Sequence, residues 1–309
     1  MSIFYNKSKS LGRKALHKEI KIEIPAGIPY NENTMNELLK YQRFLFVFDL
    51  DGTLLDSEKN ILPKTKSLLK ELVSLGNVVS IASGRPSRSI YEYSTQLDLK
   101  GPYIAYNGAA IENPYDDGFK PFRKPMSKDV ILDFLGHFGE DAFRNIMIED
   151  DKEQFYLHEN EEYVNFFHPE GMVVHIGSIL QNLKKDMMTC VIQVRDPSMK
   201  DEMVKYVNEH FENLSIRFWY DSDCFGEFYF YDTNKATSIM KLAKMYGIDR
   251  AHVICFGDAL NDLQMIRMAG ISFAMKNGVP ELKQAATFIT PYDNDHEGIY
   301  YALKDLFKI

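Results

Sequence analysis

The feature that most constrains the fold is an unbroken apolar run, Phe44-Leu45-Phe46-Val47-Phe48, which leads directly into Asp49 and Asp51. Apolar residues without alternation predict a strand that is buried on both faces, as in a parallel sheet. Parallel sheets bind their ligands at the carboxyl ends of their strands, and Gly52-Thr53 turns the chain away at this end. Two close carboxylates repel each other unless a cation or a transferred proton accounts for both. This strand end therefore predicts a reaction centre.

Alternating strand and helix patterns flank this run and predict an α/β fold with a parallel sheet covered by helices. Pro63 begins a helix that ends at Gly76, and helical residues follow Pro86. After residue 228 the rhythm resumes with helices over 235–246, 261–268 and 299–306. The expected strands are 44–48, 78–82, 103–106, 252–256, 271–275 and 287–290.

The rhythm breaks between these two stretches, where aromatic residues and paired strand-like runs predict an inserted α+β unit. The predicted strands there are 145–148, 154–158, 188–194, 215–220 and 227–231, with helices over 128–138 and 199–211. We therefore expect an N-terminal extension (1–43), a first core segment (44–112), an insertion (113–228) and a second core segment (229–309). Trp219, Tyr220, Phe155 and His158 could face a substrate from the insertion or form its own core.

Three further motifs carry residues suited to phosphate and metal chemistry. Ser83-Gly84-Arg85 follows the second strand, where a hydroxyl and a close backbone approach suit an anion. Lys235 begins a helix and offers a compact positive charge. Asp258 and Asp262 stand four apart, with Asn261 between them, at a strand end and the first turn of a helix. They can converge on a hard cation such as Mg²⁺, although Asp and Asn also suit helix starts.

The four motifs, in this order, resemble those of the haloacid dehalogenase superfamily in its Cof-type phosphatase subgroup. The resemblance covers about residues 41–309, and Ala236 stands where the family usually has Gly. Downstream, 274–278 and 295–298 continue the Cof-like pattern. The resemblance implies a Rossmann-like core with an inserted cap and a Mg²⁺-dependent phosphatase for small phosphomonoesters, most often sugar phosphates.

The resemblance also implies a role for each motif residue. Asp49 is the nucleophile that forms an aspartyl-phosphate, and Asp51 is the general acid and base. The implied phosphate ligands are Ser83, Gly84, Lys235 and Asn261. The implied metal ligands are Asp49, Asp51, Asp258 and Asp262.

Other functions of the same motif set are less well supported by the residues. A phosphomutase usually carries a cap between the first two motifs, whereas only 31 residues separate Gly52 from Gly84. A dehalogenase or an ion-pumping ATPase would not need an acid at position 51. A non-catalytic binding protein would tolerate the loss of catalytic groups, and none is missing. A nucleotide or cofactor phosphate stays open as an alternative substrate.

Bulk composition limits the partners. A net charge of −8 argues against nucleic acid as a partner. The three cysteines form neither a disulfide framework nor a metal cluster, and the sequence contains no apolar run long enough to span a membrane. We expect a cytoplasmic protein that binds a small phosphorylated metabolite; its oligomeric state is open, with a monomer as the expectation. The basic stretch within 1–43 is interpreted as a solvated extension, with 35–42 helical, rather than as a transit peptide.

Overall fold

The structure is a computed structural model that describes residues 39, 42–167, 171–219 and 224–307, together with two short strands, β1 (Ser2–Ile3) and β2 (Ile22–Glu23), which pair antiparallel. The chain divides into two compact units, one of 1–85, 89–121 and 235–309, the other of 86–88 and 122–234. The expected helix over 35–42 lies almost wholly outside the described residues, as does Tyr220. Among the described residues, no helix is both long and apolar enough to cross a membrane.

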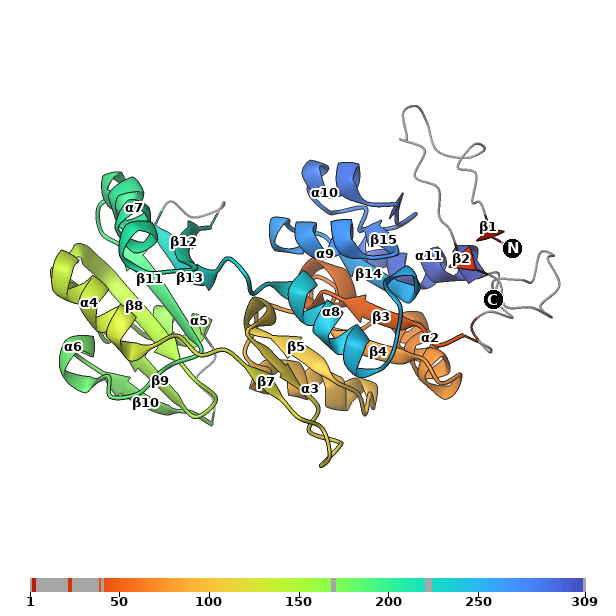
Figure 1. Ribbon diagram of the computed structural model, residues 1–309, viewed down its shortest axis with the longest axis horizontal. Coiled ribbons are helices and arrows are strands. Elements are labelled where there is room, and N and C mark those ends of the chain that lie inside the picture. Colours follow the sequence, from red (N-terminus) through yellow and green to blue (C-terminus); the bar gives the residue numbers. More distant parts are fainter. Residues whose placement is uncertain are drawn as a thin grey trace. The chain divides into compact units, whose positions relative to one another are not determined.

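A five-stranded parallel sheet forms the centre of the first unit, in the order β16-β15-β14-β3-β4 (Figure 1). The apolar run of the sequence supplies β3 (Leu45–Phe48), which is fully buried between its neighbours β4 (Val78–Ile81) and β14 (Val253–Gly257). The outer strands are β15 (Ile271–Ala274) and β16 (Phe288–Ile289). Every residue of β3, β4, β14 and β15 is buried, which explains why these four strands lack alternation. The predicted α/β class is confirmed.

Helices cover this sheet and follow the predicted sequence signals. Pro63 stands at the first position of α2 (Pro63–Ser74), and the chain leaves the helix through Gly76 at φ +88°. Helix α11 (Gly298–Phe307) contacts α2, and its Phe307 ring packs on Phe44 and Phe46. The remaining helices of this unit are α3 (Ser87–Leu97, whose first two residues group with the second unit), α8 (Lys235–Met245), α9 (Leu263–Met268) and α10 (Pro280–Ala285).

The third predicted strand, β5 (Tyr103–Ala105), belongs to a small sheet of its own with β6 (Ala110–Glu112) and β7 (Phe122–Arg123). Its link to the main sheet is one parallel bridge, from Ala82 to Ile104. Beyond this bridge, β5 pairs antiparallel with β6 instead of continuing alongside β4.

The second unit contains a six-stranded sheet in the order β10-β9-β8-β11-β13-β12, antiparallel except for the pair β9 and β10. Its strands are β8 (Phe143–Glu149), β9 (Glu153–Tyr156), β10 (Val173–Ile176), β11 (Thr189–Val194), β12 (Leu214–Phe218) and β13 (Phe225–Phe230). Its helices are α4 (Lys128–Phe138), α5 (Glu161–Phe166), α6 (Ile179–Asn182) and α7 (Lys200–His210).

One face of this sheet packs on α4 and α7 in a large apolar core that contains Phe155. The other face carries a smaller cluster around Tyr156 and Tyr163, where Trp219 packs half-buried, whereas the His158 side chain is exposed. Phe155 is therefore a core residue. The main part of this unit runs from 122 to 234, whereas the insertion was expected over 113–228, and β13 continues past residue 228 to Phe230. The expected domain bounds stay a prediction. The role of this unit as a cap stays a prediction.

Candidate active site

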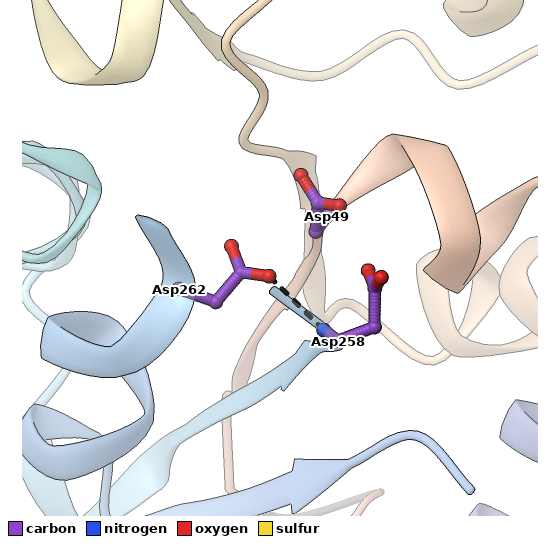
Figure 2. A group of neighbouring side chains, drawn as sticks. All are labelled: Asp49, Asp258 and Asp262. Carbon is purple, nitrogen blue, oxygen red and sulfur yellow. Dashed lines mark hydrogen bonds between the residues drawn. The ribbon is translucent and has the colours of Figure 1, made fainter. Parts of the chain in front are cut away.

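The carboxyl edge of the parallel sheet gathers three of the predicted acids. Asp49 follows β3 directly, and its backbone N–H donates to the carbonyl of Phe256 at 3.0 Å, so β3 and β14 end level with each other. Asp258 follows β14, and Asp262 lies one turn further on, immediately before α9. One carboxylate oxygen from each of the three acids lies within 4.8 Å of the others (Figure 2).

Lys235, at the start of α8, lies between two of these acids. Its Nζ donates to Asp49 Oδ1 at 2.5 Å and to Asp262 Oδ1 at 2.7 Å. The lysine and Asp262 side chains are 0% exposed and that of Asp49 only 8%, so the contacts are shielded from water. A lysine usually extends into solvent, and complete burial is found where such a charge is paired.

Asp262 also organises the backbone after β14. Its Oδ2 accepts hydrogen bonds from the N–H groups of Asp258 and Ala259, at 3.0 and 3.1 Å. The second acid of the motif thus uses both oxygens within the protein. Gly257 is required at this point, because a Cβ there would lie 2.6 Å from the Cβ of Asp262.

The charges of this cluster are not balanced by Lys235 alone. Burial raises the pKa of Asp49 well above its ordinary value, and the charge of Asp262 adds to the shift. Burial, followed by the charge of Asp262, raises the pKa of Asp258 to about 6. Burial is the largest effect on Lys235 and lowers its pKa, but the charges of Asp262 and Asp49 together outweigh burial and hold that pKa above the value of an ordinary lysine. Three ionised carboxylates against one ammonium leave two uncompensated negative charges, as many as one divalent cation neutralises.

Asp51 lies apart from this cluster, in the irregular helical turn Leu50–Leu54 after β3. Arg85 binds both of its oxygens, through Nε and Nη2 at 2.7 Å each, and Lys59 Nζ donates to Oδ1 at 2.7 Å. Burial raises the pKa of Asp51, but the hydrogen bonds from Arg85 and Lys59 outweigh it and hold that pKa below its ordinary value. Its predicted place among the metal ligands stays a prediction.

The turn that follows Asp51 requires glycine at position 52. Gly52 has φ +73°, and a Cβ at this position would lie 2.5 Å from Asp258 Oδ2. Thr53, the next residue, donates from Oγ1 to Asp258 Oδ1 at 2.7 Å. The Asp-Gly-Thr sequence therefore brings the first motif into contact with the fourth.

The predicted phosphate ligands lie at neighbouring strand ends. Ser83 is buried two residues beyond β4, and its Oγ accepts from the N–H of Arg85 at 3.2 Å. A Cβ on Gly84 would lie 3.1 Å from the side chain of Asn107, to which Asn261 Nδ2 donates at 3.2 Å. The predicted residues all lie in the first unit, and their individual roles stay proposals.

Sequence reasoning missed three residues of this site. Arg85 belongs to the motif Ser83-Gly84-Arg85 but has no predicted role of its own, and Lys59 and Asn107 lie outside the four motifs. Lys59 and Asn107 have φ of +65° and +52°, so their side chains reach the site through unusual backbone conformations. The Asn-Gly pair at a strand end was the available signal for Asn107.

The fold and the acids at the sheet edge are those of a phosphoric monoester hydrolase, as comparison with known proteins shows. The model of the haloacid dehalogenase-like hydrolases matches residues 46–303, and the chain belongs to this family. The 5-amino-6-(5-phospho-D-ribitylamino)uracil phosphatase YitU of Bacillus subtilis is 29% identical over 266 residues, covering 86% of this chain and 98% of the relative. The predicted superfamily and its Cof-type subgroup are confirmed.

Solved structures of other proteins have the same fold. A haloacid dehalogenase-like hydrolase from Bacteroides thetaiotaomicron has a TM-score of 0.73 at 26% identity, covering 86% of this chain and 100% of the other. A sugar phosphatase of subclass IIB has a TM-score of 0.70 at 22% identity, with coverage of 86% and 100%, and at that identity it shows the fold alone.

Proposed function

We propose that this protein is a Mg²⁺-dependent phosphatase that hydrolyses small phosphomonoesters through an aspartyl-phosphate on Asp49. The observation that carries the proposal is the buried contact of Asp49 with Lys235 beside Asp258 and Asp262. A buried carboxylate at the carboxyl edge of a parallel sheet, held by one ammonium, has a fixed direction for attack.

The donor set fits Mg²⁺. All three acids offer oxygen, which this ion prefers, and their oxygens lie within 4.8 Å of one another. Asp49 and Asp258 would bind the ion directly. Asp262 would act through water, because both of its oxygens already accept hydrogen bonds. When bound, the ion supplies positive charge that lets an anionic phosphate approach an anionic nucleophile.

The chain's own residues account for two successive displacements. An Asp49 oxygen forms a bond to phosphorus while the bond from phosphorus to the leaving oxygen breaks, and Asp51 gives that oxygen a proton. Asp51 then takes a proton from water, whose oxygen attacks phosphorus and releases Asp49 with inorganic phosphate. Lys235, Ser83 and Asn261 hold the phosphate oxygens during both displacements.

Asp51 has to change its protonation state between these displacements. Arg85 and Lys59 favour its carboxylate form, which is the form that accepts a proton from water. A substrate phosphate that draws Arg85 away weakens that effect, so the pKa of Asp51 rises and the side chain can carry a proton to the leaving group.

The substrate class that we propose is a phosphorylated sugar or sugar alcohol. The relative YitU is named for a phosphate ester of a ribityl chain, and the match with this chain extends over nearly all of YitU. We also propose that the second unit is a cap that selects the leaving group, because the predicted site residues all belong to the first unit. A nucleotide or a cofactor phosphate is the alternative substrate.

The test is release of inorganic phosphate from a panel of sugar, sugar-alcohol, nucleotide and cofactor phosphates, with Mg²⁺ and with a chelator. We expect metal-dependent turnover, greatest on a sugar or sugar-alcohol phosphate, and a phosphorylated Asp49 after acid quench and peptide mapping. The Asp49→Asn variant, matched in shape, serves as control. Turnover by this variant above about a hundredth of the wild-type rate would exclude the covalent mechanism.

A further inference from the structure

A turn near the C-terminus, residues 293–298, holds the loop that follows Asp51. Asp295 binds Ser57 twice, since Oδ1 accepts from the backbone N–H at 2.7 Å and Oδ2 accepts from Oγ at 2.8 Å. An exposed carboxylate that accepts two hydrogen bonds from one residue fixes that residue in both position and direction.

Glu297 holds the end of the same loop, where α2 begins. Its Oε1 accepts from the N–H of Lys64 at 2.8 Å, and its Oε2 accepts from the N–H and Oγ1 of Thr65 at 2.8 and 2.6 Å. The first N–H groups of a helix lack partners within the helix, so a carboxylate there both satisfies them and favours the helix dipole.

Two asparagines hold the beginning of the loop. Asn277 Nδ2 donates to the carbonyl of Gly52 at 2.7 Å, and Asn294 Nδ2 donates to that of Leu55 at 2.9 Å. The N–H of Asn294 donates in turn to Asn277 Oδ1 at 3.2 Å, which joins the two side chains. The loop from Gly52 to Thr65 is thus held at four points by residues more than two hundred positions later in the sequence.

This loop carries Lys59, which touches the proposed proton donor. Asp56 closes the tip of the loop through its Oδ1, which accepts from the N–H of Glu58 and of Asn60 at 2.9 and 2.7 Å. Lys59 stands within this tip at φ +65°, and its Nζ reaches Asp51 Oδ1 at 2.7 Å. The position of the loop therefore sets the position of one of the two cations that orient the Asp51 carboxylate.

We propose that Asp295, with Asn277, Asn294 and Glu297, is a positioning residue that aims Asp51 at the leaving oxygen through the loop 52–65. The proposal rests on the function proposed above, in which Asp51 is the general acid. It assigns a task in the reaction to four side chains whose hydrogen bonds, among the described residues, go to the loop and not to the side chains of Asp49, Asp258 or Asp262.

The test compares two substrates that transfer the same phosphoryl group. p-Nitrophenolate leaves without a proton, whereas the alkoxide of a sugar phosphate needs one, so misaimed acid catalysis affects the second substrate selectively. We expect Asp295→Ala to lower kcat/KM for the best sugar phosphate by about tenfold or more, and that for p-nitrophenyl phosphate by less than about twofold. Asp295→Asn, which still accepts from the Ser57 N–H, should stay close to the wild type.

The control is Asp249→Ala. Asp249 is also exposed and accepts a backbone hydrogen bond, from Ala251 at 2.8 Å, but it precedes β14 and so lies at the opposite edge of the sheet. Asp249→Ala should leave kcat/KM for both substrates unchanged. Ser57→Ala, which removes only the Oγ bond, should give a smaller loss with the same selectivity, and it serves in place of Asp295→Ala if that variant melts below assay temperature.

Equal proportional losses on both substrates would overturn the proposal, because they would show that the turn acts on folding or on phosphate binding instead. Asp51→Asn provides the benchmark: kcat/KM, which covers only the steps up to phosphorylation of Asp49, should fall by about 10²–10⁴-fold for the sugar phosphate and by far less for p-nitrophenyl phosphate. If Asp51→Asn lowers kcat/KM for both substrates equally, Asp51 is not the acid, and both this inference and that part of the proposed function fail. A selective Asp51→Asn with an unselective Asp295→Ala refutes this inference alone.

Discussion

Replacing Lys235 by Met should destabilise the metal-free protein by about 3–5 kcal/mol, the usual cost of breaking a buried ion pair from one side. Methionine fills nearly the same space, so the loss comes from charge rather than from packing. Asp49 and Asp262, with side chains 8% and 0% exposed, would lose the ammonium that now donates to them at 2.5 and 2.7 Å, and no water could take its place. At an effective dielectric constant of about 20, each such contact is worth roughly 6 kcal/mol before desolvation is subtracted.

Mg²⁺ should recover part of this loss, because it supplies positive charge to the same acids. A ligand at about a hundred times its Kd stabilises a folded protein by about 2.7 kcal/mol. The phosphatase activity should not recover, since an ion beside Asp49 does not replace the hydrogen bonds that Lys235 would make to phosphate. Urea denaturation of wild type and variant, each with chelator and with Mg²⁺, measures the first effect, and phosphate release measures the second.

Two further variants test whether the loss of stability in Lys235→Met comes from the unpaired carboxylates. Lys244→Met removes an exposed lysine from the same helix and should change stability by less than about 0.5 kcal/mol. Adding Asp262→Asn to Lys235→Met should restore at least about 1 kcal/mol, as coupled neighbours do. A loss below about 1 kcal/mol for Lys235→Met, or a double variant less stable than the single one, would refute the reasoning.

Three other predictions concern the acids. Asp49→Asn should abolish turnover yet raise the melting temperature of the metal-free protein, because it removes one charge from a buried, crowded cluster; a lower melting temperature in calorimetry would contradict this. Asp258→Ala should raise the Mg²⁺ concentration for half-maximal activity by more than about tenfold, and an unchanged metal titration would show that Asp258 only shapes the turn. Gly52→Ala should cost at least about 1 kcal/mol in strain and weaken Mg²⁺ activation, since the Cβ would lie 2.5 Å from Asp258; equal stability and activation would mean that the turn relaxes freely.

Four strands of the parallel sheet, β3, β4, β14 and β15, could be predicted because each is a mainly apolar run whose residues are all buried. β3, β4, β14 and β15 lie within two residues of their expected bounds. Strand β10 was missed because its residues are largely exposed and do not alternate in polarity. Strands β6 and β7 are only three and two residues long, too short to give a pattern.

The meeting of Asp49, Asp258 and Asp262 could be foreseen for a similar reason, since parallel strands end at one edge of the sheet. The ion pairs of Asp51 could not. The pair with Lys59 depends on a loop that holds this lysine at φ +65°, and that loop is held by residues 277–297, far away in the sequence. Local patterns carry no information about such a contact, because neither segment has a regular period.

The order of the strands also bears on how this chain is made. β3 pairs with β4 on one side, but its partner on the other side, β14, begins at Val253, after the whole of the second unit has been synthesised. Residues 122–234 are continuous and have their own core, so they can fold on the ribosome before β14, the second partner of β3, has been synthesised. An apolar strand that lacks one partner exposes unpaired N–H and C=O groups, to which other chains can bind. Asp49, at its end, also meets Lys235 and Asp262 only then. The proposed site therefore cannot be complete before Asp262 has been synthesised, and chains released earlier would expose an unpaired edge of β3.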